Sequence, residues 1–276
     1  MNKKHGTLYI VPTPIGNLED ITLRAVKILK SVSVIGAEDT RNSGNLLKHY
    51  EIKTLLFSYH KFNERARVEK ILRYLENGED VALISDAGTP GISDPAQVII
   101  REAIKNEIKV ETLPGATAFI PALVSSGFNT KRFYFLGFLP TKKSEKEQLL
   151  KSVSKIEDTL IFYEAPHRLM KFFQSLKTFL GNRKVVIARE LSKMFETYYR
   201  LTIDEILSSP EKLILKGEFV IVVEGAKTEA VSDEEIGKLL DKFLKRNFSV
   251  KAAVEKVREI TGIPKNRIYK IALSKK

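Results

Sequence analysis

Residues able to do chemistry follow a short apolar run in the first third of the sequence. Val81–Ser85 passes directly into Asp86, Gly88 and Thr89, and an apolar run bounded by glycines is typical of a buried strand. Small residues let a ligand approach the backbone, and Asp86 offers a carboxylate to a hydroxyl or an amine. A strand that runs through such a loop into a helix is where open α/β sheets bind ligands. The loop therefore predicts a ligand site, and a tight turn without a ligand is the alternative.

Three other loops of similar composition follow predicted strands. They are PTPIG at residues 12–16, PGATA at 114–118 and, with more charge, YEAPHR at 163–168. Loops of this kind on separate strands can converge on one cleft that binds a ligand mainly through backbone groups. The sequence has neither GxGxxG after the first strand nor GxxxxGK[ST], so it predicts no dinucleotide fingerprint and no P-loop. It also lacks the GxSxG elbow of serine hydrolases.

Composition narrows the function classes. No stretch approaches the roughly 20 apolar residues of a membrane span, and a strand begins almost at once, so neither a membrane anchor nor a secretory signal is expected. The chain has no cysteine, which fits a reducing, cytoplasmic compartment, and its four histidines lack HxH or HxxxH spacing, so no metal site is expected. A net charge of +12 favours a polyanionic partner, nucleic acid first. A lysine-rich enzyme without such a partner is the alternative.

Strands and helices alternate over residues 1–226, which predicts an α/β fold. The alternation in the first part predicts a mostly parallel sheet with helices on both faces. Glu19–Asp20 is expected to open the first helix, with Leu23 and Leu29 on its buried face, and Asp94–Pro95 to begin a later one. Ten strands are expected, in two groups that divide near residue 116: 7–11, 33–37, 55–57, 81–85 and one near 110, then 132–136, 159–163, 184–188, 196–201 and 219–223.

The C-terminal residues are different in kind, because from Ser232 onward the pattern predicts helices only. Ser232 and Glu235 form a capping box, and two later helices flank a Gly262–Pro264 turn, an arrangement similar to a helix-turn-helix unit. Residues 227–276 hold 13 basic and 7 acidic side chains, so this segment is expected to bind RNA, and a small helical cap with solvated lysines is the alternative. The expected domains are residues 1–116, 117–226 and 227–276.

Six motifs, in this order and spacing, resemble the tetrapyrrole methylase superfamily: VPTPIGNLEDIT, AEDTR, ISDAGTPGISDP, PGATA, FYEAPHR and ARELSKMFE. The resemblance covers residues 7 to about 226, and within the superfamily it is to the enzymes that methylate small-subunit ribosomal RNA. It implies two α/β domains with S-adenosylmethionine folded into the cleft between them, usually in a homodimer. It further implies 2′-O-methylation of a cytidine ribose in 16S-type ribosomal RNA, either as naked RNA or in the small ribosomal subunit.

The resemblance also implies a set of residues that contact the cofactor. Prolines in the first loop depart from the tetrapyrrole-modifying members, which argues against corrin-type substrates. At each position the alternative is a residue that only shapes its turn. The set comprises Pro12, Pro14, Ile15, Gly16, Asp86, Ala87, Gly88, Thr89, Ala116, Thr117, Tyr163, Glu164, Ala188 and Arg189.

Methyl transfer to a hydroxyl requires alignment and removal of a weakly acidic proton. A carboxylate such as Glu190 could accept this proton while Lys193 or Arg41 stabilises the developing alkoxide. Glu190 and Lys193 are three residues apart, so only a helical turn or a bend would bring both to one side. The catalytic candidates are Asp39, Arg41, His60, Glu190 and Lys193, and a structural ion pair is the alternative for each. Candidates for RNA contacts are Lys61, His167, Arg168, Lys251, Lys265, Arg267 and Lys270.

Two other functions remain open at this point. One is a small-molecule methyltransferase of the same superfamily, in which the C-terminal helices cap a dimer. The other is an RNA-binding module whose cleft has lost its chemistry. The intact loop at Asp86 and the presence of Thr117 argue against the second.

Overall fold

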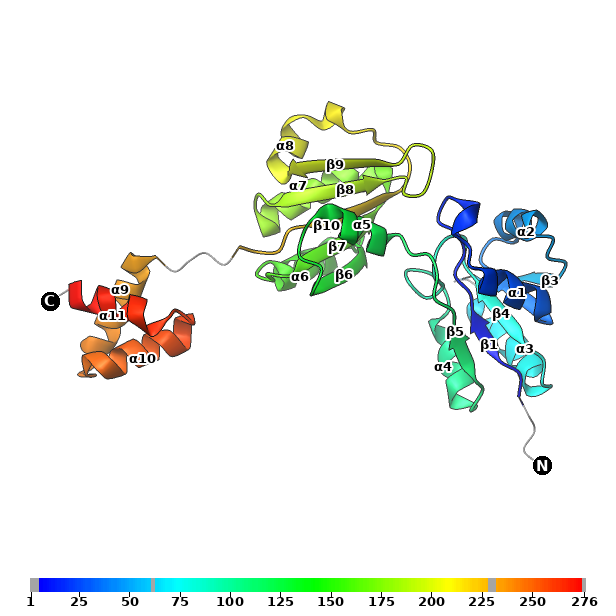
Figure 1. The fold of residues 1–276 in the computed structure, drawn as a ribbon, viewed down its shortest axis with the longest axis horizontal. Helices are drawn as coiled ribbons and strands as arrows, with labels where there is room; N and C mark the ends of the chain where they lie inside the picture. The colour runs from blue at the N-terminus through cyan, green and yellow to red at the C-terminus, as the bar shows by residue number, and fades with distance from the viewer. Residues whose placement is uncertain (1–4, 61–62, 228–231, 275–276) are drawn as a thin grey trace. The chain divides into compact units, whose positions relative to one another are not determined.

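The computed structural model describes residues 5–60, 63–227 and 232–274. The chain separates into two compact units, residues 1–226 and residues 227–276. In the first unit, strands and helices alternate through two five-stranded sheets (Figure 1). The predicted boundary at residue 116 falls in the link between the last strand of the first sheet and α5, the helix that packs on the second.

The alternation predicted a mostly parallel sheet, and the first sheet is parallel throughout, with strand order β3-β2-β4-β1-β5. Alternate strand residues face opposite sides: Val34 packs with α3 and α4, whereas Ile35 packs with α1 and α2. Helices therefore cover both faces of this sheet. Its elements are β1 (Leu8–Ile10), α1 (Leu23–Ser31), β2 (Val34–Ala37), α2 (Thr40–His49), β3 (Leu55–Ser58), α3 (Glu64–Glu76), β4 (Val81–Ile84), α4 (Gln97–Lys105) and β5 (Val110–Thr112).

The neighbouring strands β1 and β4 form the switch point of this sheet. The helix after β1 covers one face and the helix after β4 covers the other, so the two following loops diverge and leave a crevice at the carboxyl edge. The loops are joined where they start, because the backbones of Thr13 and Gly88 exchange two hydrogen bonds of 2.9 Å. Gly88 has φ +80°, a conformation that favours glycine.

The second sheet is mixed, with order β6-β7-β10-β8-β9 and only the β6–β7 pair parallel. Strand β7 again divides its side chains: Phe162 faces α6, α7 and α8, whereas Ile161 faces α5. The elements are α5 (Phe119–Ser126), β6 (Phe133–Phe138), α6 (Lys143–Val153), β7 (Thr159–Glu164), α7 (Leu169–Leu180), β8 (Lys184–Arg189), β9 (Thr197–Thr202), α8 (Ile203–Ser208) and β10 (Phe219–Val223).

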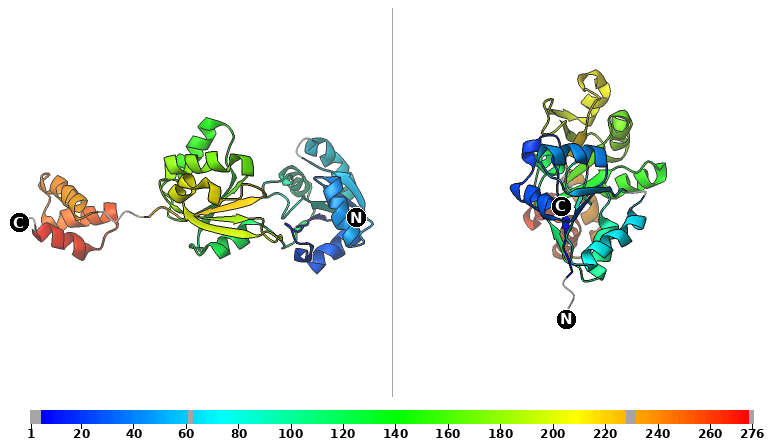
Figure 2. Two further views of the ribbon diagram at one scale, coloured as in Figure 1. Left: turned by 90° about the horizontal axis from the view of Figure 1, so that it is seen from above. Right: turned by 90° about the vertical axis from the view of Figure 1, so that its right-hand side faces the viewer.

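The C-terminal unit consists of three helices around a core of its own (Figure 2). They are α9 (Asp233–Leu244), α10 (Val250–Thr261) and α11 (Lys265–Ser274). The predicted capping box is confirmed, because Ser232 and Glu235 exchange side chain-to-backbone hydrogen bonds. Gly262 ends α10 with φ +68°, which is the usual left-handed end of a helix. Across the residues with described positions, no helix has the length and apolar character needed to cross a membrane.

Two predicted helix starts are wrong. Leu18–Asp20 forms a separate 3-10 turn, and α1 begins only at Leu23, where the Thr22 side chain accepts from the Ala25 backbone N–H. This later start turns Leu23 outward, 83% exposed, and buries Ala25 with Leu29. Helix α4 begins at Gln97 rather than Pro95, because Ser93, with φ +71°, turns the chain before Asp94.

Candidate functional site

The loops after β1, β4 and β5 meet residues of the second sheet around a cavity of about 310 Å³, which we call cavity A. Seven of the fourteen predicted cofactor residues line it, namely Ile15, Ala87, Gly88, Thr89, Thr117, Tyr163 and Glu164. Its other lining residues include Ile92, Asp94, Ala118, Phe138, Gly217 and Glu218. The walls are largely apolar, as expected of a small-molecule site with a few polar contacts.

One polar atom of cavity A is left without a partner. The Thr117 hydroxyl is buried and makes no hydrogen bond with any described residue, whereas the Thr89 hydroxyl donates to the Ala116 carbonyl at 3.0 Å. A buried hydroxyl without a partner is costly, and a ligand in cavity A would supply one. The cavity thus fits a ligand that combines apolar surface with a hydrogen-bonding group.

Three acidic side chains, those of Asp94, Glu164 and Glu218, line cavity A. Burial raises the pKa of the Asp94 carboxyl to about 7, the nearby Glu38 and Asp86 carboxylates add to the rise, and a hydrogen bond with Ser85 opposes it. Burial, together with Asp86, also raises the pKa of Glu38. Because each carboxylate disfavours ionisation of the others, a positively charged ligand would be stabilised here.

A second cavity, of about 350 Å³, adjoins the first, and we call it cavity B. The two share Ile15, Ala87 and Glu218, so their walls are continuous. Asp86 faces cavity B rather than cavity A, and its Oδ1 accepts from the Asp39 backbone N–H at 3.1 Å. The remaining lining residues are Thr13, Pro14, Gly16, Leu18, Asn42, Asn45, Leu46 and Lys193.

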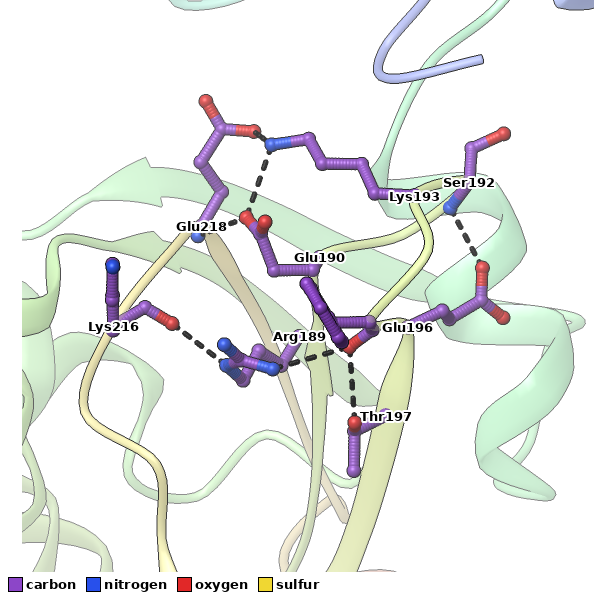
Figure 3. A network of polar contacts seen from close by, with 9 residues as sticks. Arg189, Glu190, Ser192, Lys193, Glu196, Thr197, Lys216 and Glu218 are labelled. Carbon is purple, nitrogen blue, oxygen red and sulfur yellow. Dashed lines mark hydrogen bonds and ion pairs between the residues drawn. The ribbon is translucent and has the colours of Figure 1, made fainter.

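A charged network joins the loop after β8 to the start of β10 (Figure 3). Lys193 Nζ lies 3.0 Å from Glu190 Oε1 and 2.8 Å from Glu218 Oε2. Burial alone would lower the pKa of Lys193, but its hydrogen bonds with the two carboxylates outweigh it and raise that pKa. Likewise, burial would raise the pKa of Glu190, but the hydrogen bonds from Lys193 and the Glu218 backbone N–H lower it. The chain turns between these two residues, where the Lys193 backbone N–H donates to the Glu190 carbonyl at 3.1 Å, and the turn pairs their side chains.

The sequence profile of Tetrapyrrole (Corrin/Porphyrin) Methylases matches residues 7–207. The chain belongs to the tetrapyrrole methylase family. Similar relatives named ribosomal RNA small subunit methyltransferase I occur in Synechocystis sp., with 43% identity over 97% of this chain and 98% of the relative, and in Bacillus subtilis, with 41% identity over 96% and 93%.

Solved structures of low sequence identity share the fold of the first unit. Uroporphyrin-III-C-methyltransferase from Thermus thermophilus matches with a TM-score of 0.58 and 18% identity over 79% of this chain and 94% of that one. Diphthine synthase matches with a TM-score of 0.62 and 11% identity over 79% of this chain and 90% of the diphthine synthase chain. The family profile ends before the C-terminal unit, whereas the alignments with the ribosomal RNA methyltransferases span nearly the whole chain. Those alignments therefore include most of residues 227–276.

Four of the predicted cofactor residues lie away from cavities A and B. Ala116 lines a third cavity with Gly115 and Tyr198. Pro12 is buried and packs directly against Gly115, and Ala188 lies in the core beneath α5.

The fourth of these residues, Arg189, has a structural role here. Its guanidinium donates to the carbonyls of Lys216 and Phe195 and so holds two loops in place. None of Pro12, Ala188 and Arg189 lines any of the cavities described.

Three of the predicted catalytic residues lie after β2 and β3, outside these cavities. Hydrogen bonds from Arg41 hold the pKa of Asp39 down to about 2, which makes this carboxylate a poor proton acceptor near neutral pH. His60 Nε2 lies 3.2 Å from Asn63 Nδ2. None of the three lines cavity A or cavity B, and hydrogen bonds join Asp39 to Arg41 and to Asp86. Across residues 5–60, 63–227 and 232–274, no group of three His, Cys, Asp or Glu side chains is arranged to hold a metal ion.

Some of the residues predicted to contact RNA are held in ion pairs, whereas others are exposed. Arg168 binds Glu164 at 3.2 Å and donates to the Leu139 carbonyl at 2.7 Å, so its charge is compensated, whereas His167 is exposed. In the C-terminal unit, Lys265 pairs with Glu255 and Arg267 with Asp233, whereas Lys251 and Lys270 are exposed. Lys61 lies outside the described residues.

Sequence reasoning missed several residues that line this site, among them the polar residues Asn42, Asn45, Asp94 and Glu218. The asparagines lie one helical turn apart just after the AEDTR motif, a spacing that places two side chains on one helix face. That spacing is the sequence signal from which the two asparagines could have been predicted. Glu218 precedes a strand, so only the strand order places it at the same sheet edge as Glu190.

Proposed function

We propose that this chain transfers the methyl group of S-adenosylmethionine to the ribose 2′-hydroxyl of a cytidine in small-subunit ribosomal RNA, acting as a homodimer. The observation that carries this proposal is the continuity of cavity A, which fits a cationic ligand, with cavity B, where Lys193 and Glu218 lie. The relatives named as ribosomal RNA methyltransferases support the choice of substrate. The excess of positive charge in residues 227–276 supports a polyanionic substrate such as RNA.

We assign the cofactor to cavity A. When bound, S-adenosylmethionine supplies an electrophilic methyl group on a positively charged sulfonium. The Thr117 hydroxyl would gain the hydrogen-bond partner that it lacks, and the carboxylates around Asp94 would offset the positive charge. Ile15, Ala118 and Phe138 offer apolar surface to the remainder of the molecule.

We assign the chemistry to the junction of the two cavities. The Lys193 ammonium, kept protonated by its raised pKa, would stabilise negative charge that develops on the ribose oxygen. The Glu218 carboxylate lines both cavities and would accept the hydroxyl proton. Glu190, predicted as the proton acceptor, instead holds Lys193 in place from outside the lining.

Thr117→Val tests the cofactor site, because valine has the shape of threonine without its hydroxyl. Cofactor affinity should fall about 3- to 10-fold, the usual loss for one neutral hydrogen bond. The melting temperature of the free protein should hold or rise, because an unpaired buried hydroxyl is removed. Calorimetry and thermal unfolding measure the two effects, and Thr178→Val, at an exposed site on α7, serves as the control. Unchanged affinity would exclude a hydrogen bond between Thr117 and the cofactor.

Cofactor affinity should depend on pH through Asp94. Since the pKa of Asp94 is raised to about 7, this carboxyl is mostly neutral at pH 6, and a cationic ligand favours its ionised form. Affinity for S-adenosylmethionine should therefore increase as pH rises from 5.5 to 7.5, with proton release on binding below pH 7. S-adenosylhomocysteine lacks the sulfonium charge and should show a weaker dependence. In the Asp94→Asn variant, the pH dependence of affinity should become similar for the two ligands. If S-adenosylmethionine still showed the stronger pH dependence, a group other than Asp94 would be responsible.

A single experiment separates the three candidate functions. Small ribosomal subunits that lack the modification are incubated with the protein and S-adenosylmethionine carrying a tritiated methyl group, and the RNA is then digested to nucleosides. Label recovered as 2′-O-methylcytidine supports the proposal. Label on small molecules alone would indicate a small-molecule methyltransferase, and RNA binding without transfer would indicate a binding module. Sedimentation measures whether the chain is a dimer.

A further inference from the structure

Two asparagines on one face of α2 give cavity B a polar edge. Asn42 and Asn45 are three residues apart on the helix, so both side chains reach the cavity, and both are exposed. Pro14, Leu18 and Leu46 supply apolar walls to the same cavity. Its volume of about 350 Å³ lies within the range of small-ligand pockets. Apolar walls with amide groups along one edge suit a flat ring that carries hydrogen-bonding groups on its rim.

The orientation of the Asn42 amide follows from its neighbour. Asn42 Nδ2 lies 3.5 Å from Asp86 Oδ2, and a carboxylate accepts hydrogen bonds but does not donate them. The NH₂ group of Asn42 is therefore the end that faces Asp86, and Oδ1 is the end left for a ligand. Asp86 is itself anchored, because its Oδ1 accepts from the Asp39 backbone N–H. The contact with Asp86 thus favours the orientation in which Asn42 presents a hydrogen-bond acceptor to the cavity.

We propose that cavity B holds the base of the acceptor nucleotide and that Asn42 and Asn45 select cytosine over uracil. This inference rests on the proposed function. The exocyclic amino group of cytosine would donate to Asn42 Oδ1, and the Asn45 amide, with no carboxylate partner described, would donate to the ring nitrogen. Uracil presents a carbonyl in place of the amino group, so two acceptors would face each other at Asn42. The ribose would then lie toward Lys193 and Glu218, where cavity B adjoins cavity A.

The test compares two acceptor RNAs that differ only at the target nucleotide, cytidine or uridine, in single-turnover methyl transfer. The wild-type protein should prefer cytidine. Asn42→Leu, which keeps the size of the side chain, should reduce that preference about 10- to 100-fold, the usual discrimination from a good side chain–base contact. Asn45→Leu should reduce the rate on cytidine. Gln174→Leu removes an exposed amide on α7, away from the cavities, and should change neither the rate nor the preference for cytidine. Unaltered cofactor affinity shows that each variant is folded.

A cytidine analogue without the exocyclic amine sharpens the assignment to Asn42. The wild-type rate should fall on this analogue, whereas the Asn42→Leu rate should fall little further, because the two changes remove the same contact. Equal slowing of the variant on cytidine and uridine, or additive effects of variant and analogue, would overturn the assignment while leaving the proposed function intact. A wild-type protein that transfers no methyl group to either RNA would overturn both.

Discussion

Replacing Lys193 by methionine should slow methyl transfer about 10²-fold or more, within the range found when a group that stabilises developing charge is removed. The Lys193 side chain packs so closely on Gly16 that a Cβ there would collide with it. Methionine keeps this apolar contact and removes only the charge. Cofactor affinity should therefore change little, because Lys193 lines cavity B and not cavity A. Single-turnover rates and calorimetry measure the two quantities.

Two further variants test how this charge is held. Lys193→Arg retains a cation and should recover part of the rate. Glu190→Gln should have a smaller effect, about 10-fold, because its amide oxygen can still accept from Lys193 and from the Glu218 backbone N–H. A Lys193→Met variant with the normal rate and normal RNA affinity would remove Lys193 from the reaction. Glu218→Gln should then be examined alone as the proton acceptor.

Deleting residues 227–276 should weaken RNA binding about 10- to 100-fold at moderate salt and flatten its salt dependence, because fewer counterions are released when phosphate contacts are lost. The segment is a compact unit with a separate hydrophobic core, so residues 1–226 should remain folded. Cofactor affinity should persist, because every residue that lines cavity A belongs to the first unit. Filter binding across a salt series gives the slope.

Single substitutions distinguish phosphate contact from a merely structural role. Lys251→Ala and Lys270→Ala should each reduce the salt slope by about 0.7 to 0.9, since both side chains are exposed. Lys265→Ala should instead lower the stability of the helical unit slightly, because it breaks the pair with Glu255. If the truncated protein keeps the salt slope of the full chain, the C-terminal helices are a structural cap.

The sequence alone determined the α/β architecture, because its signals are local. Apolar runs such as Val81–Ser85 and Phe219–Val223 predict strands whatever surrounds them, and the Ser232–Glu235 capping box needs only four consecutive residues. The six motifs further identified the family, because their residues shape tight loops at strand ends. Seven of the cofactor residues inferred from them line one cavity. Two helix starts were wrong, because Thr22 caps α1 and a turn at Ser93 delays the start of α4.

Tertiary structure alone decided which side chains share a site. Glu218 meets Lys193 because β10 lies antiparallel between β7 and β8, so that its first residues reach the edge where those strands end. The raised pKa of Asp94 depends on burial beside Glu38, 56 residues away in sequence. Asn42 gains a preferred orientation because Asp86 approaches it from another loop. The distances between such residues and the burial of their side chains depend on strand order and packing. Strand order and packing are not encoded in any short stretch of the chain.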